Sequence, residues 1–308
     1  MIRTQPKEYS SIRYLEAKRT VDDRALNQQV WHRLIDELGI LPGEGPLQVL
    51  EAGAGVGTMV ERLVEWGVCI DFDYTAVDSA PFLLDHAYRR LIGWAEARGR
   101  LAERLGQGRL IVDGDGQRII LQLRAEDIFD IAQREGGNWD LIGAHAFLDL
   151  VDLDMAIPCL FSLLRPGGLF YFTLVFDGVT IFRPPIDPLF DSCVEACYHQ
   201  SMKRRTDHGE PGERSQTGRM LLEALTFQRV PVLAAGSSDW LVYPPYVRDE
   251  GYFLHHIVHL MEESLNGCPD LEPHRLDRWL ATRHRHVEEG RLIYVAHQLD
   301  VLGRIADR

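Results

Sequence analysis

The sequence predicts an α/β protein built on a doubly wound, mainly parallel sheet. From residue 47 to residue 176, short apolar runs alternate with segments of helical period. That alternation is typical of parallel strands joined by right-handed crossovers, with helices on both faces of the sheet. The first run ends in a glycine-rich turn, and ligands of such sheets bind beyond the carboxyl ends of the strands. We therefore expect the functional site at that edge.

Composition bounds the class of protein. The chain has 308 residues, of which 45% are hydrophobic and 26% charged, and this balance supports one large domain with insertions. No apolar run approaches the roughly eighteen residues of a membrane span, and the first residues lack the apolar core of a secretory signal. We predict a cytoplasmic protein that does not enter a membrane.

The net charge and the spacing of the cysteines limit the kinds of ligand and partner that we expect. The formal net charge is −13 and the longest basic block is residues 203–205, so most of the surface would repel a nucleic acid. The five cysteines include no C-x-x-C pair, which favours reduced thiols. Cys193 and Cys197 would share one helix face, but no second Cys or His pair has matching spacing. We predict a small-molecule partner and no metal site.

Each element follows from local signals. Thr20 and Asp23 form a T-x-x-D capping box, after which apolar residues at helical spacing predict one helix that Gly39 ends. Residues 110–123 predict two strands around a turn at 113–116. The remaining predicted strands are 47–51, 69–78, 139–147, 168–176, 229–235 and 291–299, and the remaining helices are 58–66, 81–105, 155–164 and 218–226.

Two stretches interrupt this alternation. Residues 177–215 are rich in Pro, Asp and Arg, and residues 239–289 contain two helix-like runs. Insertions at these points of such a sheet would cover the ligand crevice. We therefore expect residues 41–308 to form one domain, whose two helical insertions cap the acceptor site. Residues 1–40, which precede this domain, are predicted separately as an N-terminal helical lid segment.

The most informative segment is the turn after the first strand, residues 51–57, which read E-A-G-A-G-V-G. Glycines let a ligand approach the backbone where a Cβ would collide, and the next helix offers free N–H groups. Asp78 ends the second strand, where a carboxylate can accept hydrogen bonds from a ribose diol. A dinucleotide usually requires G-x-G-x-x-G. The carboxylate of Glu51 would repel a pyrophosphate, whereas it suits the ammonium and sulfonium charges of S-adenosylmethionine.

The pattern E-x-G-x-G-x-G resembles the first motif of class I S-adenosylmethionine-dependent methyltransferases. Four later segments resemble further landmarks of that family in the same order: Val77-Asp78, residues 125–128 (A-E-D-I), 139–142 (W-D-L-I) and 164–168 (L-R-P-G-G). The resemblance covers residues 47–176. It implies a seven-stranded sheet of order 3-2-1-4-5-7-6, in which residues 292–296 form an antiparallel seventh strand.

The same resemblance implies S-adenosylmethionine as cofactor and S-adenosylhomocysteine as product. Asp78 would bind the ribose, and Asp127 or Glu126 would meet the adenine amino group, although these acids could instead cap helices or lie in solvent. The implied cofactor-binding residues are Glu51, Gly53, Gly55, Gly57, Asp78, Glu126, Asp127, Ile128 and His145.

His145 is the candidate catalytic residue. It directly follows the predicted fourth strand, within G-A-H-A-F, where small neighbours leave room for an acceptor. Imidazole can take a proton at neutral pH, so we expect a rate that rises through an apparent pKa of about 6–7. The alternative is that His145 lines the pocket and alignment alone supplies the rate.

These signals together predict methyl transfer to O or N of a small-molecule acceptor. The chain lacks the Asn-Pro-Pro-Tyr or Asp-Pro-Pro-Tyr sequence that marks family members acting on exocyclic base amines. Three alternatives remain: a non-catalytic S-adenosylmethionine-binding regulatory protein, an aminopropyltransferase of the same fold, and a nicotinamide-dependent oxidoreductase. The sequence leaves the oligomeric state undetermined.

Overall fold

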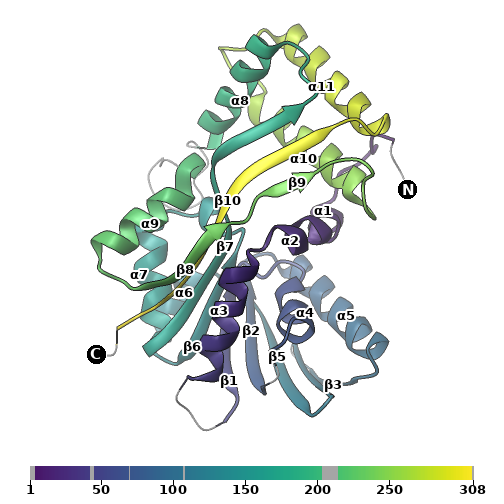
Figure 1. Ribbon diagram of the computed structural model, residues 1–308. Coiled ribbons are helices and arrows are strands. Elements are labelled where there is room, and N and C mark those ends of the chain that lie inside the picture. The colour runs from purple at the N-terminus through teal and green to yellow at the C-terminus, as the bar shows by residue number, and fades with distance from the viewer. Residues whose placement is uncertain (1–3, 42–44, 69, 107, 203–213, 307–308) are drawn as a thin grey trace.

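A computed structural model describes residues 4–41, 45–68, 70–106, 108–202 and 214–306 (Figure 1). The described strands form one ten-stranded sheet, β3-β4-β5-β2-β1-β6-β7-β10-β8, with β9 paired to β10. Those strands are β1 (Leu47–Ala52), β2 (Phe72–Asp78), β3 (Leu101–Gly106), β4 (Arg109–Gly114), β5 (Gln117–Ala125), β6 (Trp139–His145), β7 (Leu164–Arg183), β8 (Val232–Ser237), β9 (Trp240–Val242) and β10 (Ile293–Arg304).

Helices cover both faces of this sheet. One face packs against α3, α4 and α5, and the other against α6, α7 and α9, because each helix turns an apolar stripe toward the strands. The described helices are α1 (Ser11–Ala17), α2 (Arg19–Ala25), α3 (Gln28–Gly39), α4 (Thr58–Glu65), α5 (Pro81–Ala97), α6 (Ile128–Arg134), α7 (Leu153–Leu163), α8 (Pro188–Met202), α9 (Thr217–Phe227), α10 (Glu250–Leu265) and α11 (Pro273–Glu288).

The strand order confirms the predicted fold class. Numbered in chain order, the strands β5-β2-β1-β6-β7-β10-β8 have the order 3-2-1-4-5-7-6. The first five run parallel, and β10 is antiparallel to all three strands with which it pairs, β7, β8 and β9. The extra strands β3 and β4 extend the edge beyond β5 as antiparallel neighbours. The chain leaves β1 toward β2 and returns to β6 on the other side, so the topological switch point lies between β1 and β6.

Two predicted elements were wrong. The helix expected to reach residue 105 ends at Ala97, because Gly99 turns the chain with φ of +69° and residues 101–106 pair with β4 as a strand. The capping box at Thr20 does not form, since Thr20 lies inside α2 and its hydroxyl donates to Glu250. Asn27 instead starts a second helix, α3, by accepting bonds from two amides of its first turn.

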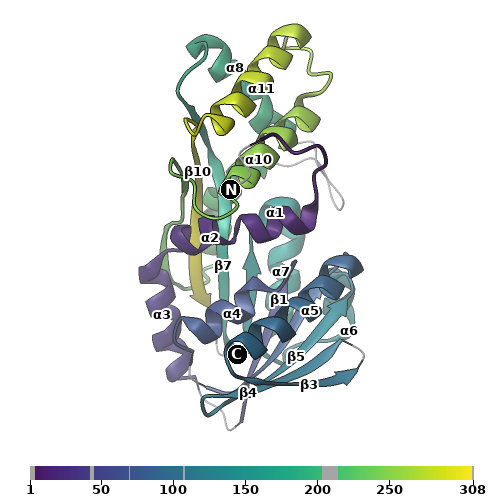
Figure 2. The same cartoon turned by 90° about the vertical axis from the view of Figure 1, so that its right-hand side faces the viewer.

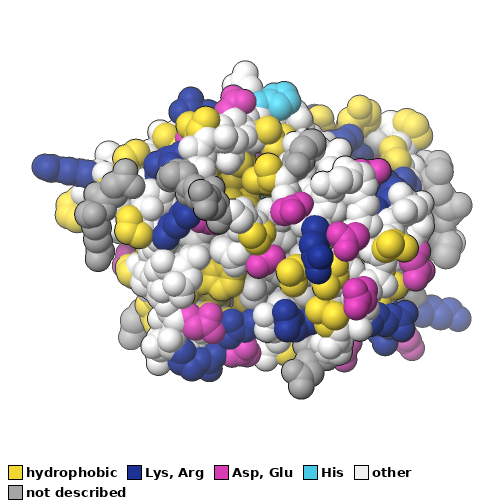
Figure 3. Space-filling view, turned by 90° about the horizontal axis from the view of Figure 1, so that it is seen from below, with side chains coloured by type: hydrophobic (Ala, Val, Ile, Leu, Met, Phe, Trp, Pro, Cys, Tyr) yellow, Lys and Arg dark blue, Asp and Glu magenta, His cyan; other side chains and the backbone are white. Residues whose placement is uncertain are grey.

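An upper lobe rises above the carboxyl ends of the parallel strands. The upper parts of β7 and β10 leave the sheet together, and they carry β9 with α8, α10 and α11 (Figures 1 and 2). Both views place α1 and α2 between this lobe and the sheet. The opposite end of the molecule shows acidic and basic side chains interspersed (Figure 3). Among the described helices, none has the length and apolar character needed to span a bilayer.

Candidate functional site

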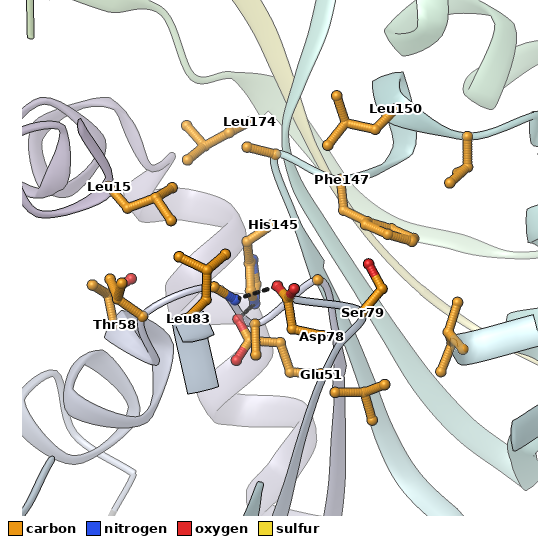
Figure 4. Close-up of a pocket in the computed structure, with 18 of the residues that line it drawn as sticks. Leu15, Glu51, Thr58, Asp78, Ser79, Leu83, His145, Phe147, Leu150 and Leu174 are labelled. Carbon is orange, nitrogen blue, oxygen red and sulfur yellow. Dashed lines mark hydrogen bonds and ion pairs between the residues drawn. The ribbon is translucent and has the colours of Figure 1, made fainter. Parts of the chain in front are cut away.

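A pocket of about 350 Å³ opens at the switch point, over the carboxyl ends of β1, β2, β5 and β6 (Figure 4). Its volume lies within the roughly 300–1,000 Å³ range of small-molecule sites. We call its lower wall the floor, formed by the turn 53–56 with Glu51 and Asp78. We call its upper wall the roof, formed by Leu15, Lys18 and Asp22 of the N-terminal helices.

The floor depends on a turn that only glycine adopts without strain. Gly53, Gly55 and Gly57 have φ of +70°, +54° and +74°. The carboxylate of Asp78 holds this turn, since its Oδ2 accepts a hydrogen bond of 2.9 Å from the Gly55 amide (Figure 4). Its Oδ1 accepts from the Ala80 amide at 2.9 Å, which orients the carboxylate. Gly57 does not line the pocket, because its Cα faces α5, where a Cβ would lie 3.2 Å from Leu91.

Glu51 places a buried carboxyl group beneath the turn. It lies on β1, and its Oε2 accepts a hydrogen bond of 2.6 Å from the Tyr74 hydroxyl on β2. Its side chain is only 4% exposed. Burial raises the pKa of Glu51 to about 7, and the bond from Tyr74 and the charge of Arg62 only partly offset that rise. A cation bound above this group would favour its ionised form.

His145 lies at the end of β6, beside Glu51 and inside the pocket wall. Its Nδ1 is 2.6 Å from the Thr173 hydroxyl of β7, and its Nε2 is 4.0 Å from Oε1 of Glu51. Gly143 makes this position possible, because a Cβ there would lie 2.9 Å from Nε2. The sequence analysis expected the small residues around His145 to leave room for an acceptor. In the structure, Gly143 instead makes room for the imidazole ring of His145.

The environment of His145 also changes its expected titration. Burial lowers the pKa of His145 well below its ordinary value, and the charges of Arg62 and Lys18 act in the same direction. The ring is therefore neutral at pH 7. Of the two neighbours, Glu51 rather than His145 titrates near the pH at which the sequence predicted a rate change.

Three further predicted residues meet at the end of β5. Glu126, Asp127 and Ile128 all line the pocket. Both oxygens of Glu126 are bonded to arginines, Arg124 and Arg134, which hold the pKa of this carboxyl below its ordinary range. Asp127 caps α6 by accepting from the Phe129 amide at 2.8 Å. Both acids thus have structural partners as well as a place at the pocket.

Sequence reasoning did not identify the charged groups of the roof as a unit. Arg62 of α4 is 2% exposed, and it pairs with Asp23 at 2.7 Å and with Asp22 at 3.7 Å. Lys18 lies 3.4 Å from Asp22 on the same side of the pocket. Arg62 of α4 lies about forty residues after Asp22 and Asp23 of α2, so no local sequence pattern relates these charges.

The upper lobe reaches the pocket only indirectly. No described residue of 177–290 lines it, and part of the predicted cap, residues 203–213, lies outside the described chain. The lobe instead holds the N-terminal helices: Arg13 forms two hydrogen bonds with Asp249, and buried Glu250 accepts from Thr20 and Arg24. Rings stack across the same contact, where Tyr14 faces His256 with centroids 4.4 Å apart.

No family model matches this sequence, and no curated protein resembles it at a significant level. Among solved structures, it is similar to an S-adenosylmethionine-dependent methyltransferase from Thiobacillus denitrificans in complex with S-adenosyl-L-homocysteine, with 15% identity, coverage of 96% and 98% of the two chains, and a TM-score of 0.47. It is also similar to a candidate type II methyltransferase from Anaeromyxobacter dehalogenans, with 17% identity, coverage of 89% and 96%, and a TM-score of 0.48. The YcgJ protein of Bacillus subtilis shows 11% identity, coverage of 90% and 99%, and a TM-score of 0.47.

The order and direction of the strands define the architecture independently of these distant similarities. This chain has the class I methyltransferase fold. Its pocket lies where that topology switches, and eight of the nine residues predicted to bind a cofactor line it, with Gly57 the exception.

Proposed function

We propose that this protein transfers a methyl group from S-adenosylmethionine to O or N of a small-molecule acceptor. The observation that carries the proposal is the floor of the pocket, where a glycine turn with positive φ angles and two carboxyl groups, Glu51 and Asp78, face one cavity. The glycine turn offers backbone close to a ligand, and the acids suit ammonium, sulfonium and ribose groups. Bound there, S-adenosylmethionine would supply an activated methyl group.

The acceptor would lie under the roof. Leu15, Leu150 and Leu174 give this part of the pocket apolar walls (Figure 4), to which Lys18 and Asp22 add two charged groups. A largely apolar wall with a few polar groups favours a small acceptor that has both a hydrophobic part and a polar group. In this proposal most of the rate comes from aligning acceptor and methyl group in a chamber without bulk water.

His145 remains the proposed proton acceptor, through Nε2. Its ring is neutral at pH 7, and the nearby Glu51 carboxylate would stabilise the imidazolium that forms. Because a low pKa makes a weak base, the loss of turnover in His145→Gln should be about 10²-fold, at the lower end for general-base catalysis. The rise of kcat/KM for S-adenosylmethionine near pH 7 should persist in this variant and disappear in Glu51→Gln.

Three measurements test the function itself. Calorimetry with S-adenosylhomocysteine, and fluorescence titration with NADH, should give binding of the first and none of the second. Transfer of labelled methyl groups to a library of small alcohols and amines should then identify acceptors. Binding without turnover on any acceptor would favour a regulatory protein, whereas tight NADH binding would favour an oxidoreductase.

A further inference from the structure

A group of potential metal ligands lies in the upper lobe, away from the pocket. The Sγ atoms of Cys197 and Cys268 and a carboxylate oxygen of Asp270 all lie within 4.8 Å of one another. Cys197 is buried on α8, whereas Cys268 and Asp270 belong to the turn between α10 and α11. The two segments meet at a small cavity of about 80 Å³, whose wall also carries hydroxyl and amide side chains. Segments distant in sequence thus bring three donors to one point.

The donor set suits a thiophilic divalent ion. Tetrahedral Zn²⁺ binds thiolates at about 2.3 Å and carboxylate oxygens at about 2.0–2.2 Å, so its ligands lie roughly 3.4–3.8 Å apart. The observed 4.8 Å is the upper limit of the separations here. Closing them therefore takes shifts of about 1 Å or less, within the reach of side-chain rotations.

Both cysteines of the group are free thiols rather than partners in a disulfide. A divalent ion bound between them would displace the thiol protons, and its charge would be balanced by the two thiolates and the Asp270 carboxylate.

We propose that Cys197, Cys268 and Asp270 bind Zn²⁺, with a water molecule as fourth ligand. The ion joins α8 to the turn between α10 and α11 and so rigidifies the lobe whose α10 supports the roof of the pocket. The sequence pattern predicted no metal site, because Cys268 lies far along the chain from Cys197 and has no partner at a recognisable spacing.

Cobalt provides an optical test in the reduced full-length protein. Titration with Co²⁺ should give one equivalent bound, with thiolate-to-cobalt charge-transfer absorption and the visible bands of tetrahedral cobalt. Zn²⁺ should displace these bands and raise the melting temperature. Cys197→Ser and Cys268→Ser should each abolish the charge-transfer band or weaken binding about 100-fold, and Asp270→Asn should weaken it about 10-fold. Cys159→Ser, on α7, is the matched control and should leave the titration unchanged.

Alkylation provides a readout that does not depend on the folding of variants. Zn²⁺ should protect the half-buried Cys268 of the wild-type protein from iodoacetamide, as measured by mass spectrometry, and leave the exposed Cys193 reactive. Absence of charge transfer, or equal loss in Cys159→Ser, would overturn the proposal. So would a Cys197–Cys268 disulfide in protein isolated without reductant, if the reduced protein then binds no metal.

Discussion

In the floor of the pocket the backbone itself carries the geometry, whereas the roof depends on side chains from separated parts of the chain. The glycine turn is fixed by its positive φ angles and by a hydrogen bond from the Gly55 amide to Asp78. A second hydrogen bond, from the Ala80 amide, orients the Asp78 carboxylate. The roof helices are held by ion pairs and stacked rings from the upper lobe and from Arg62 of α4. The difference teaches that substitutions in the floor should remove binding, and substitutions in the roof should mainly loosen it.

The largest effect is expected at the turn. In Gly55→Val, a β-branched residue would have to adopt φ of +54°, and its Cβ would lie 3.3 Å from Leu15. S-adenosylhomocysteine affinity should fall about 100-fold or more by calorimetry, because both the turn and the approach to its backbone are lost. Gly93→Ala, at an exposed position inside α5 with open space around it, is the control and should bind normally. If Gly55→Val binds S-adenosylhomocysteine as tightly as the wild-type protein, the glycine turn is not part of the binding site.

The next effect is expected at Asp78. Asp78→Ala removes the acceptor of two backbone amides and the proposed partner of the ribose. Hydrogen bonds to a charged group contribute about 1.5–3 kcal/mol, so affinity for S-adenosylhomocysteine should fall about 10- to 100-fold. Asp73→Ala is the matched control, because Asp73 lies on the same strand outside the pocket and accepts from Gln48, and it should change affinity less than about 3-fold. Comparable losses in the two variants would contradict a special role for Asp78.

Glu51 should produce an effect that depends on pH. Its folded-state pKa of about 7 lies above the ordinary value, so its contribution to stability is fully present below the unfolded pKa and is lost as pH rises through 7. Glu51→Gln, which can still accept from Tyr74, should therefore raise the free energy of unfolding by about 1–3 kcal/mol at pH 8. Urea denaturation should show a smaller gain at pH 5.

Cofactor affinity should depend on pH in the opposite direction to stability, because binding requires the ionised form of Glu51. If an ammonium or sulfonium group of the cofactor requires ionised Glu51, wild-type affinity should weaken up to about tenfold per pH unit below 7. Glu51→Gln should bind about tenfold more weakly at pH 8 and lose this pH dependence. If the affinity of the wild-type protein does not change with pH, ionisation of Glu51 has no role in cofactor binding.

The smallest effect on binding is expected in the roof. Glu250→Ala removes the buried acceptor of Thr20 and Arg24, so α1 and α2 should exchange amide hydrogens about tenfold faster in the absence of ligand. Affinity for S-adenosylhomocysteine should fall only about 2- to 5-fold. Glu263→Ala, on the exposed side of the same helix, should leave both measurements unchanged. A loss as large as that of Gly55→Val would show that floor and roof act as one unit.

Local sequence pattern was sufficient to predict the parts of the pocket that come from residues close together in the chain. The strand ending at Glu51, the glycines after it and the acid ending β2 lie within thirty residues, and alternation of strand and helix places their carboxyl ends together. The antiparallel last strand, β10, was expected from the family resemblance rather than from local pattern. Local pattern erred at Thr20, which lies inside α2 and donates to Glu250 instead of capping a helix, and at residues 101–105, where pairing with β4 overrides the helical signal.

The sequence by itself therefore determined the parallel strands of the sheet, its switch point and the residues that form the floor of the pocket. Only the tertiary structure decided which residues close the pocket, the neutral state of His145 and the raised pKa of Glu51, because burial and distant charges set these properties. The same holds for the grouping of Cys197 with Cys268 and Asp270, since α8 and the turn after α10 meet only when the upper lobe folds.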